Sequence, residues 1–147
     1  MASAVVPFAL LVAVLNAAAA MVGAWTWWRG DVSRLFWWLA RGGQIAAVVF
    51  AALSGVAFLV GEEPADDLFW LYALLPLAVG FVAEQLRAIS ARTELDAREL
   101  EDAQAMRVLA DAEQRAIVVA ILRREMAVMA CSAAVVAFLA LRAATTW

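Results

Sequence analysis

Four long apolar segments constrain this chain more than any other feature of its sequence. They cover approximately residues 5–28, 35–60, 68–90 and 116–143. A helix needs about 20 residues to cross a hydrocarbon core roughly 30 Å thick, and each segment meets that length. We therefore predict an all-α fold in which residues 1–147 form a single integral membrane domain, a four-helix transmembrane bundle.

The overall composition favours the same conclusion. Apolar residues make up 67% of the 147 residues, whereas a soluble domain contains about 45–50%. A chain this short cannot bury so much apolar surface in a core of its own, because small domains leave a large share of their surface exposed. A lipid bilayer removes that difficulty.

The connecting segments differ in character. Residues 29–34 form a tight turn, and residues 61–67 form a short acidic turn that contains a proline. Residues 90–115 are polar and contain neither glycine nor proline, so we predict a helical hairpin that extends the helices on either side of it. Asp111 and Gln114 have the spacing of a capping box, which places the turn of the hairpin near residues 109–111.

The arginines predict the orientation of the bundle. In an up-and-down path, ten of the eleven basic residues fall on one side, and only Arg142 falls on the other. The positive-inside rule then puts residues 29–34 and 84–125 in the cytoplasm, and the 61–67 turn and both termini outside a bacterial inner membrane. The hairpin thus becomes a cytoplasmic helical extension, either solvated or docking a protein partner. Interfacial aromatics agree, with an inner belt of Trp25, Trp27, Trp28, Trp37 and Trp38 and an outer group of Trp70, Tyr72 and Trp147.

The first segment has an alternative interpretation as a cleaved signal peptide, because NAAAA follows an apolar run. Signal peptides begin with a positively charged region. Here no charge precedes Arg29, so we expect the segment to remain as a membrane span.

A layer of charged and polar residues is expected at the inner edge of the bundle. Counting 1.5 Å per residue from the outer turn places Arg41 about 30 Å in, Glu84 about 24 Å and Arg87 about 28 Å. A carboxylate at the depth of Glu84 is costly without a partner, so we expect it to pair with Arg41, Arg87 or Arg123. The candidate residues are Arg41, Gln44, Glu84, Arg87, Arg123, Arg124 and Glu125.

Three interpretations of this layer remain open. The arginines are interfacial and reach toward headgroups, with the two glutamates as structural partners. Alternatively, the surplus positive charge forms a site for an anion or an anionic lipid headgroup, which guanidinium groups grip in two-pronged fashion. The third interpretation is an ion or proton pathway, although no acidic residue falls at the middle of a span.

Polar and small residues inside the spans predict helix packing. Asn16 is expected to find a hydrogen-bond partner on a neighbouring helix, whereas Ser54 and Ser132 can bond to their own helices. Pro76 is expected to kink its helix or to free the carbonyl of Tyr72, for packing or as a gate. Residues spaced by four form a ridge for close helix approach, within the chain or between copies: Gly43, Ala47, Ala51 and Gly55.

The sequence argues against several chemistries. It contains no histidine, which removes a bis-histidine haem site and an ordinary zinc site. Cys131 is the single cysteine, so the chain cannot form an internal disulfide. We find no nucleotide-binding glycine loop, nucleophile elbow or metal-ligand spacing. We therefore predict no metal, no cofactor and no enzymatic activity.

Three stretches carry a family resemblance: FWWLARGGQ at residues 36–44, LYALLPLAVGFVAEQLR at 71–87 and AILRREMAVMA at 120–130. They resemble those of small four-span membrane proteins of high-GC bacteria, a group with no established activity. The resemblance covers most of the chain from the second span onward. It implies the four-span topology and a shared charged layer, and it implies no function.

The sequence thus favours a non-enzymatic membrane binding or scaffold protein whose inner arginine layer engages anionic lipid headgroups or a small anionic ligand. The alternative is a small channel or transporter, which four short spans build only as an oligomer, through residues 35–60. An enzyme acting on lipid ranks third. The expected partners are membrane lipids, a second copy of the chain or a cytoplasmic protein, with no nucleic acid.

Overall fold

The computed structural model describes residues 2–97 and 109–147 and arranges them in four helices. These are α1 (Ala2–Arg29), α2 (Arg34–Leu59), α3 (Leu68–Asp96) and α4 (Asp111–Thr146). All four are long and apolar enough to cross a membrane. The predicted all-α fold with four membrane-spanning helices is confirmed.

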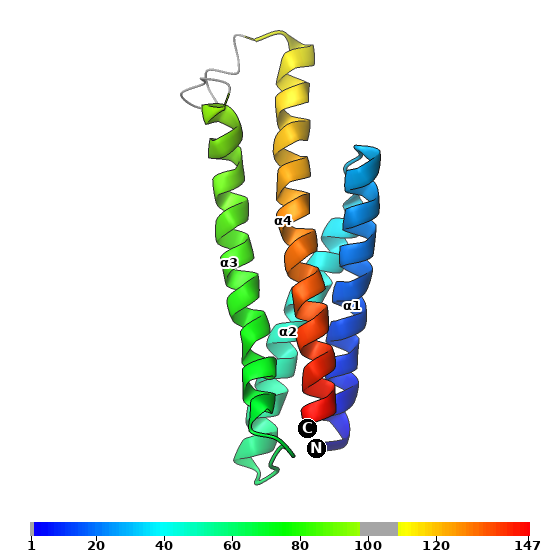
Figure 1. Ribbon diagram of the computed structural model, residues 1–147, viewed down its shortest axis with the longest axis vertical. Helices are drawn as coiled ribbons and strands as arrows, with labels where there is room; N and C mark the ends of the chain where they lie inside the picture. Colours follow the sequence, from blue (N-terminus) through cyan, green and yellow to red (C-terminus); the bar gives the residue numbers. More distant parts are fainter. Residues whose placement is uncertain (1, 98–108) are drawn as a thin grey trace.

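The helices run alternately up and down, so both termini lie at the same end of the molecule (Figure 1). At the opposite end, α4 and to a lesser degree α3 reach beyond the turn between α1 and α2. The two ends of the predicted 90–115 hairpin, residues 90–96 and 111–115, belong to these two helices, whereas residues 98–108 lie outside the described part of the chain. The predicted capping box is wrong in detail, because Ala110 is the N-cap of α4. The Gln114 side chain instead donates to the carbonyl of Leu109 at 2.9 Å.

Local sequence explains where the first two helices end. Gly30 and Gly61 follow α1 and α2 with φ angles of 79° and 87°, a left-handed conformation that glycine adopts without a steric penalty. Ser33 then caps the start of α2, because its hydroxyl accepts a hydrogen bond from the amide of Phe36 at 3.2 Å. At the next turn the Asp66 carboxylate accepts from the amide of Leu68 at 2.9 Å.

The bundle is built around the packing of α4 on its neighbours. α4 packs extensively against α1 and α3, and α1 also packs against α2, whereas α2 and α3 touch each other little. Two core clusters result, one near the termini around Phe50 and Phe69, and one near the other end around Phe36 and Met126. Alanine dominates both clusters, and its small side chain lets helix backbones approach closely where lipid provides no hydrophobic drive for association.

The predicted ridge of small residues on α2 contacts another helix over only part of its length. A Cβ atom at Gly43 would lie 2.7 Å from the Asn16 side chain of α1, so these helices meet closely there, and Ala47 is buried. Ala51 is half-buried, and a Cβ atom at Gly55 would meet no atom of the chain within 4 Å. The prediction that the whole ridge packs against another helix of the chain is therefore wrong at Gly55. The reason is that α2 diverges from α1 toward its C-terminal end (Figure 1).

Candidate functional site

Glu84 of α3 is the centre of the charged layer. Its Oε1 atom accepts hydrogen bonds from Arg41 Nη1 at 2.6 Å and from Gln44 Nε2 at 3.0 Å, both on α2. Its Oε2 atom accepts from Arg87 Nε at 2.9 Å, one turn along α3. The expected pairing of Glu84 is thus confirmed with two of the three predicted arginines. The helical spacing of three residues sets the contact with Arg87, whereas the contact with Arg41 depends on how α2 and α3 are placed.

Arg87 extends the layer from α3 to α4. Its Nη1 atom lies 3.6 Å from Glu125 Oε2, and its guanidinium carbon lies 5.7 Å from the centre of the Trp37 ring. Guanidinium groups stack well on aromatic faces, so this contact adds to the ion pairs. Three helices therefore contribute to one connected set of charges.

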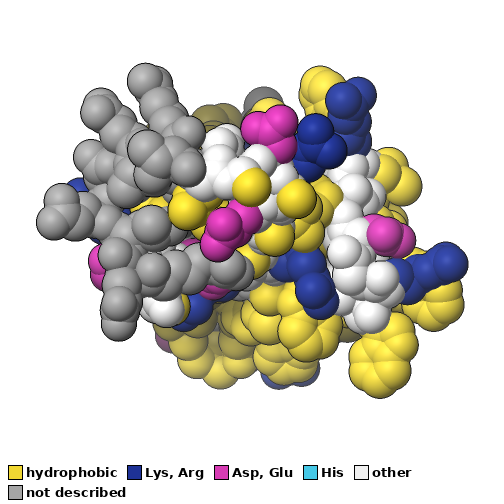
Figure 2. All heavy atoms as spheres, turned by 90° about the horizontal axis from the view of Figure 1, so that it is seen from above, with side chains coloured by type: hydrophobic (Ala, Val, Ile, Leu, Met, Phe, Trp, Pro, Cys, Tyr) yellow, Lys and Arg dark blue, Asp and Glu magenta, His cyan; other side chains and the backbone are white. Residues whose placement is uncertain are grey.

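Arg123 and Arg124 stand apart from this set. Arg123 Nη2 donates to the backbone carbonyl of Trp27 at 3.2 Å, so this residue of α4 caps the C-terminal turn of α1. The pairing of Glu84 with Arg123 is not observed. Arg124 is exposed and forms no ion pair with any residue that the structure describes. Figure 2 shows this end of the molecule, where basic and acidic side chains gather beside a rim of hydrophobic ones.

The connected set of Arg41, Glu84, Arg87 and Glu125 has no net charge but still contains unused hydrogen-bond donors. Arg41 and Arg87 balance the charges of Glu84 and Glu125. A guanidinium group carries five N–H donors, yet Arg41 uses only Nη1, for Glu84 and Gln44. The Arg41 side chain remains 46% exposed. Its other guanidinium nitrogens are therefore available to an acidic group arriving from outside the bundle.

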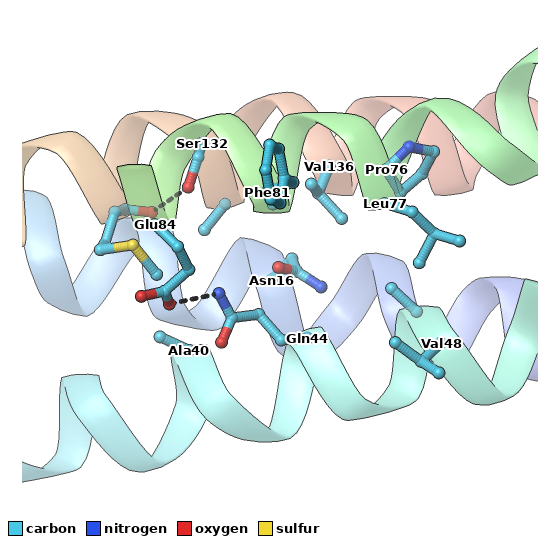
Figure 3. A pocket seen from close by; sticks show the side chains of 14 residues that line it. Asn16, Ala40, Gln44, Val48, Pro76, Leu77, Phe81, Glu84, Ser132 and Val136 are labelled. Carbon is cyan, nitrogen blue, oxygen red and sulfur yellow. Dashed lines mark hydrogen bonds between the residues drawn. The ribbon is translucent and has the colours of Figure 1, made fainter. Parts of the chain in front are cut away.

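A cavity of about 230 Å³ begins at this layer and continues toward the end with the termini (Figure 3). Its floor is buried and comes from α1 and α4, with Asn16, Met129, Ala133 and Val136 at most 5% exposed. Its rim comes from α2 and α3, where Val48 is 57% and Phe81 66% exposed. The cavity therefore opens sideways between α2 and α3, two neighbouring helices that touch each other little.

Polar groups are concentrated at one end of the cavity. Glu84 and Ser132 line the end near the charged layer with Gln44 beside them, Asn16 lies midway, and Val48, Pro76 and Leu77 line the other end (Figure 3). Such a lining matches an amphipathic ligand, since polar and apolar parts of the ligand would each meet a similar surface.

The intramembrane polar residues bond mainly within their own helices. Asn16 Nδ2 donates to the Val12 carbonyl at 2.9 Å. The prediction of a hydrogen-bond partner on a neighbouring helix is therefore wrong. Ser54 donates to Phe50 and Ser132 to Met129, both at 2.9 Å and both as expected. The difference arises because the carboxamide reaches back one helical turn and lies close to Gly43.

Sequence analysis missed the cavity and one close helix contact. Pro76 was assigned to packing or gating, yet it is buried and lines the cavity. At Gly23 of α1 a Cβ atom would lie 2.7 Å from both Phe36 and Ala130, which makes this glycine a contact point for α2 and α4. A glycine within an apolar helix was the available signal, but nothing in the sequence identified its neighbours.

Comparison of the chain with protein-family models, with curated proteins and with solved structures found no match. The resemblance to small four-span bacterial membrane proteins therefore stays a prediction.

Proposed function

We propose that this protein is a non-enzymatic membrane binding protein that holds an anionic lipid headgroup at its charged layer. Arg41 supports this function most directly, since its guanidinium is fixed through one nitrogen by Glu84 and Gln44 while its side chain stays 46% exposed. A positioned guanidinium with free N–H groups suits the two-pronged recognition of phosphate or carboxylate.

The proposed setting is the inner leaflet of a bacterial inner membrane, with both termini outside. The charged layer lies toward the end of the bundle opposite the termini, as do eight of the nine arginines that the structure describes. Anionic lipids attract such basic groups electrostatically. In this orientation the ends of α3 and α4 beyond the α1–α2 turn form the cytoplasmic extension, which is free to dock a protein partner.

Native mass spectrometry from mild detergent tests the lipid site. The protein is incubated with phosphatidylglycerol, and retained lipid is compared for the wild type and for Arg41→Gln, Arg124→Gln and Arg142→Gln. We expect Arg41→Gln to weaken binding roughly tenfold, the effect of losing a charged hydrogen bond worth about 1.5 kcal/mol.

The other two variants are matched controls for charge alone. Arg124 lies at the same end of the bundle but outside the connected set, and Arg142 lies at the other end, where it stacks on Tyr72 at 5.6 Å. Both should retain lipid nearly as well as the wild type. Equal losses of bound lipid in all three variants would mean that the arginines attract lipid only as interfacial charges and that no specific lipid site exists.

An oligomeric channel or transporter is the second candidate, and the surface around Gly55 favours it. A Cβ atom at Gly55 would have open space around it, and Phe58 and Leu59 nearby are 51% and 83% exposed. A second copy could therefore approach the open part of the ridge closely. The same mass spectra report the copy number, and a monomer that retains lipid would exclude this candidate.

A further inference from the structure

The most informative feature beyond the charged layer is the carboxamide of Asn16 in the wall of the cavity. Asn16 is only 3% exposed. Its nitrogen must face the Val12 carbonyl, because a carbonyl accepts and does not donate. The Oδ1 atom therefore points away from that carbonyl, and it accepts no hydrogen bond from any residue that the structure describes.

The Asn16 Oδ1 atom is not fully enclosed by protein, so a ligand in the cavity can donate a hydrogen bond to it. Figure 3 shows the Asn16 carboxamide pointing into the space that the lining residues enclose. Ser132 lines the same space, and its hydroxyl hydrogen is already used in the bond to Met129, so its oxygen is also left to accept. The cavity thus offers two acceptors that no donor of the described residues meets.

The rest of the cavity limits what can supply that donor. Beyond Asn16 the lining is apolar, with Val48, Leu77 and Val136, while Arg41 stands at the polar end beside Gln44. A ligand that fits has an acidic head for Arg41, a hydroxyl that donates its one hydrogen to Asn16 or to Ser132, and an apolar chain for the remainder.

We propose that the cavity binds a single-chain anionic phospholipid with a free glycerol hydroxyl, that is, an anionic lysophospholipid. This inference rests on the proposed headgroup site and names the lipid class that occupies it. In a two-chain phospholipid the same hydroxyl is esterified, so the donor is lost and a second chain must be placed. The volume of about 230 Å³ exceeds the roughly 150 Å³ of an engineered apolar cavity that holds benzene, and it suits part of one chain.

Competition between matched lipids tests the lipid class. The intact protein in mild detergent is offered lysophosphatidic acid and two-chain phosphatidic acid of equal chain length, which differ in the free backbone hydroxyl and carry no hydroxylated headgroup, and bound lipid is read by native mass spectrometry. We expect at least a tenfold preference for the lysolipid. Equal retention of both lipids would overturn the inference and leave the headgroup site standing, whereas retention of neither would overturn the proposed function itself.

Variants locate the hydroxyl contact. Asn16→Leu and Ser132→Ala should each reduce the preference for the lysolipid severalfold without reducing binding of the two-chain lipid, which depends on Arg41. Ser54→Ala is the matched control, since Ser54 is fully buried, bonds within its own helix and does not line the cavity. Ser132→Ala keeps the test decisive if Asn16→Leu does not fold. An unchanged preference in folded variants would overturn the role of these two residues.

Photo-crosslinking locates the chain. A lysophosphatidylglycerol with a diazirine midway along its chain is irradiated with the protein, and adducts are mapped by peptide mass spectrometry. We expect adducts on Val48, Leu77 and Val136. Adducts confined to Leu75, Val82 and Val135, which line a separate surface groove between α3 and α4, would show that the lipid lies around the bundle and would overturn the inference.

Discussion

At the scale of single residues, one carboxylate organises the candidate site. Glu84 accepts three hydrogen bonds, from Arg41, Gln44 and Arg87, and so orders two guanidinium groups from different helices. Ion pairs with exposed partners contribute little to stability, about 0–1 kcal/mol. The main consequence of this pairing is therefore the fixed position of Arg41 and the compensation of its charge.

Removing the charge of Glu84 separates those two consequences. In Glu84→Gln the layer gains one net positive charge, so we expect tighter retention of phosphatidylglycerol, severalfold over the wild type. The stability of the fold should fall by no more than about 1 kcal/mol, because the pairs are partly exposed. Lipid titrations followed by native mass spectrometry measure the first effect, and thermal unfolding in detergent measures the second.

Arg41→Gln and Glu84→Gln are expected to change lipid retention in opposite directions, which makes this a strict test. Arg41→Gln removes a binding group and Glu84→Gln removes its competitor, although each breaks the same ion pair. If both variants lose lipid to the same extent, the pair acts only as a structural link between α2 and α3.

At the scale of helices, close approach is concentrated where glycine meets a polar or aromatic side chain. Gly43 allows α2 to pack on Asn16, and Gly23 allows α1 to pack on Phe36 and Ala130. Such contacts matter in lipid because helix association there depends on van der Waals packing and hydrogen bonds. They also leave α2 and α3 loosely joined, which opens the cavity between them.

Two glycines of the same helix provide a matched comparison. Gly43→Leu forces a large side chain against Asn16 and should lower the free energy of unfolding by about 1–3 kcal/mol. Gly55→Leu meets open space and should change it by less than about 0.5 kcal/mol. Unfolding of each variant in mixed detergent measures both values, and similar losses would contradict the packing described here.

Gly55→Leu has a second use. If the open part of the ridge is an interface between copies, this substitution should shift the protein toward monomers without destabilising each copy. Native mass spectrometry of the same sample reports that shift.

At the scale of the whole molecule, the path of the chain sets both termini at one end and the arginine-rich region at the other. The expected orientation can be read by cysteine labelling of intact cells after Cys131, which is exposed, is replaced by alanine. Glu63→Cys, in the turn between α2 and α3, should react with an impermeant maleimide.

Asp31→Cys, in the turn between α1 and α2, should react only after the cells are opened. Both positions are exposed, so access to solvent is matched. Labelling of Asp31→Cys alone in intact cells would reverse the orientation and place the charged layer in the outer leaflet.

The sequence alone was sufficient to predict the four helices, their approximate bounds and the similar depth of the charged residues along the bundle. These properties are local, since segment length, hydropathy and the rise per residue act along one helix at a time. The turns were equally readable, because glycine at positive φ and a serine cap are local devices.

The tertiary structure alone decided which helices touch and what they enclose. Arg41 reaches Glu84 while Arg123 turns to Trp27, although depth along the bundle made both equally suitable partners. Asn16 faces a cavity, and a Cβ atom at Gly55 would have open space around it. These outcomes depend on the rotation of each helix about its axis and on the spacing between helices, which result from packing many side chains at once. In an evenly apolar helix no polar stripe fixes that rotation beforehand.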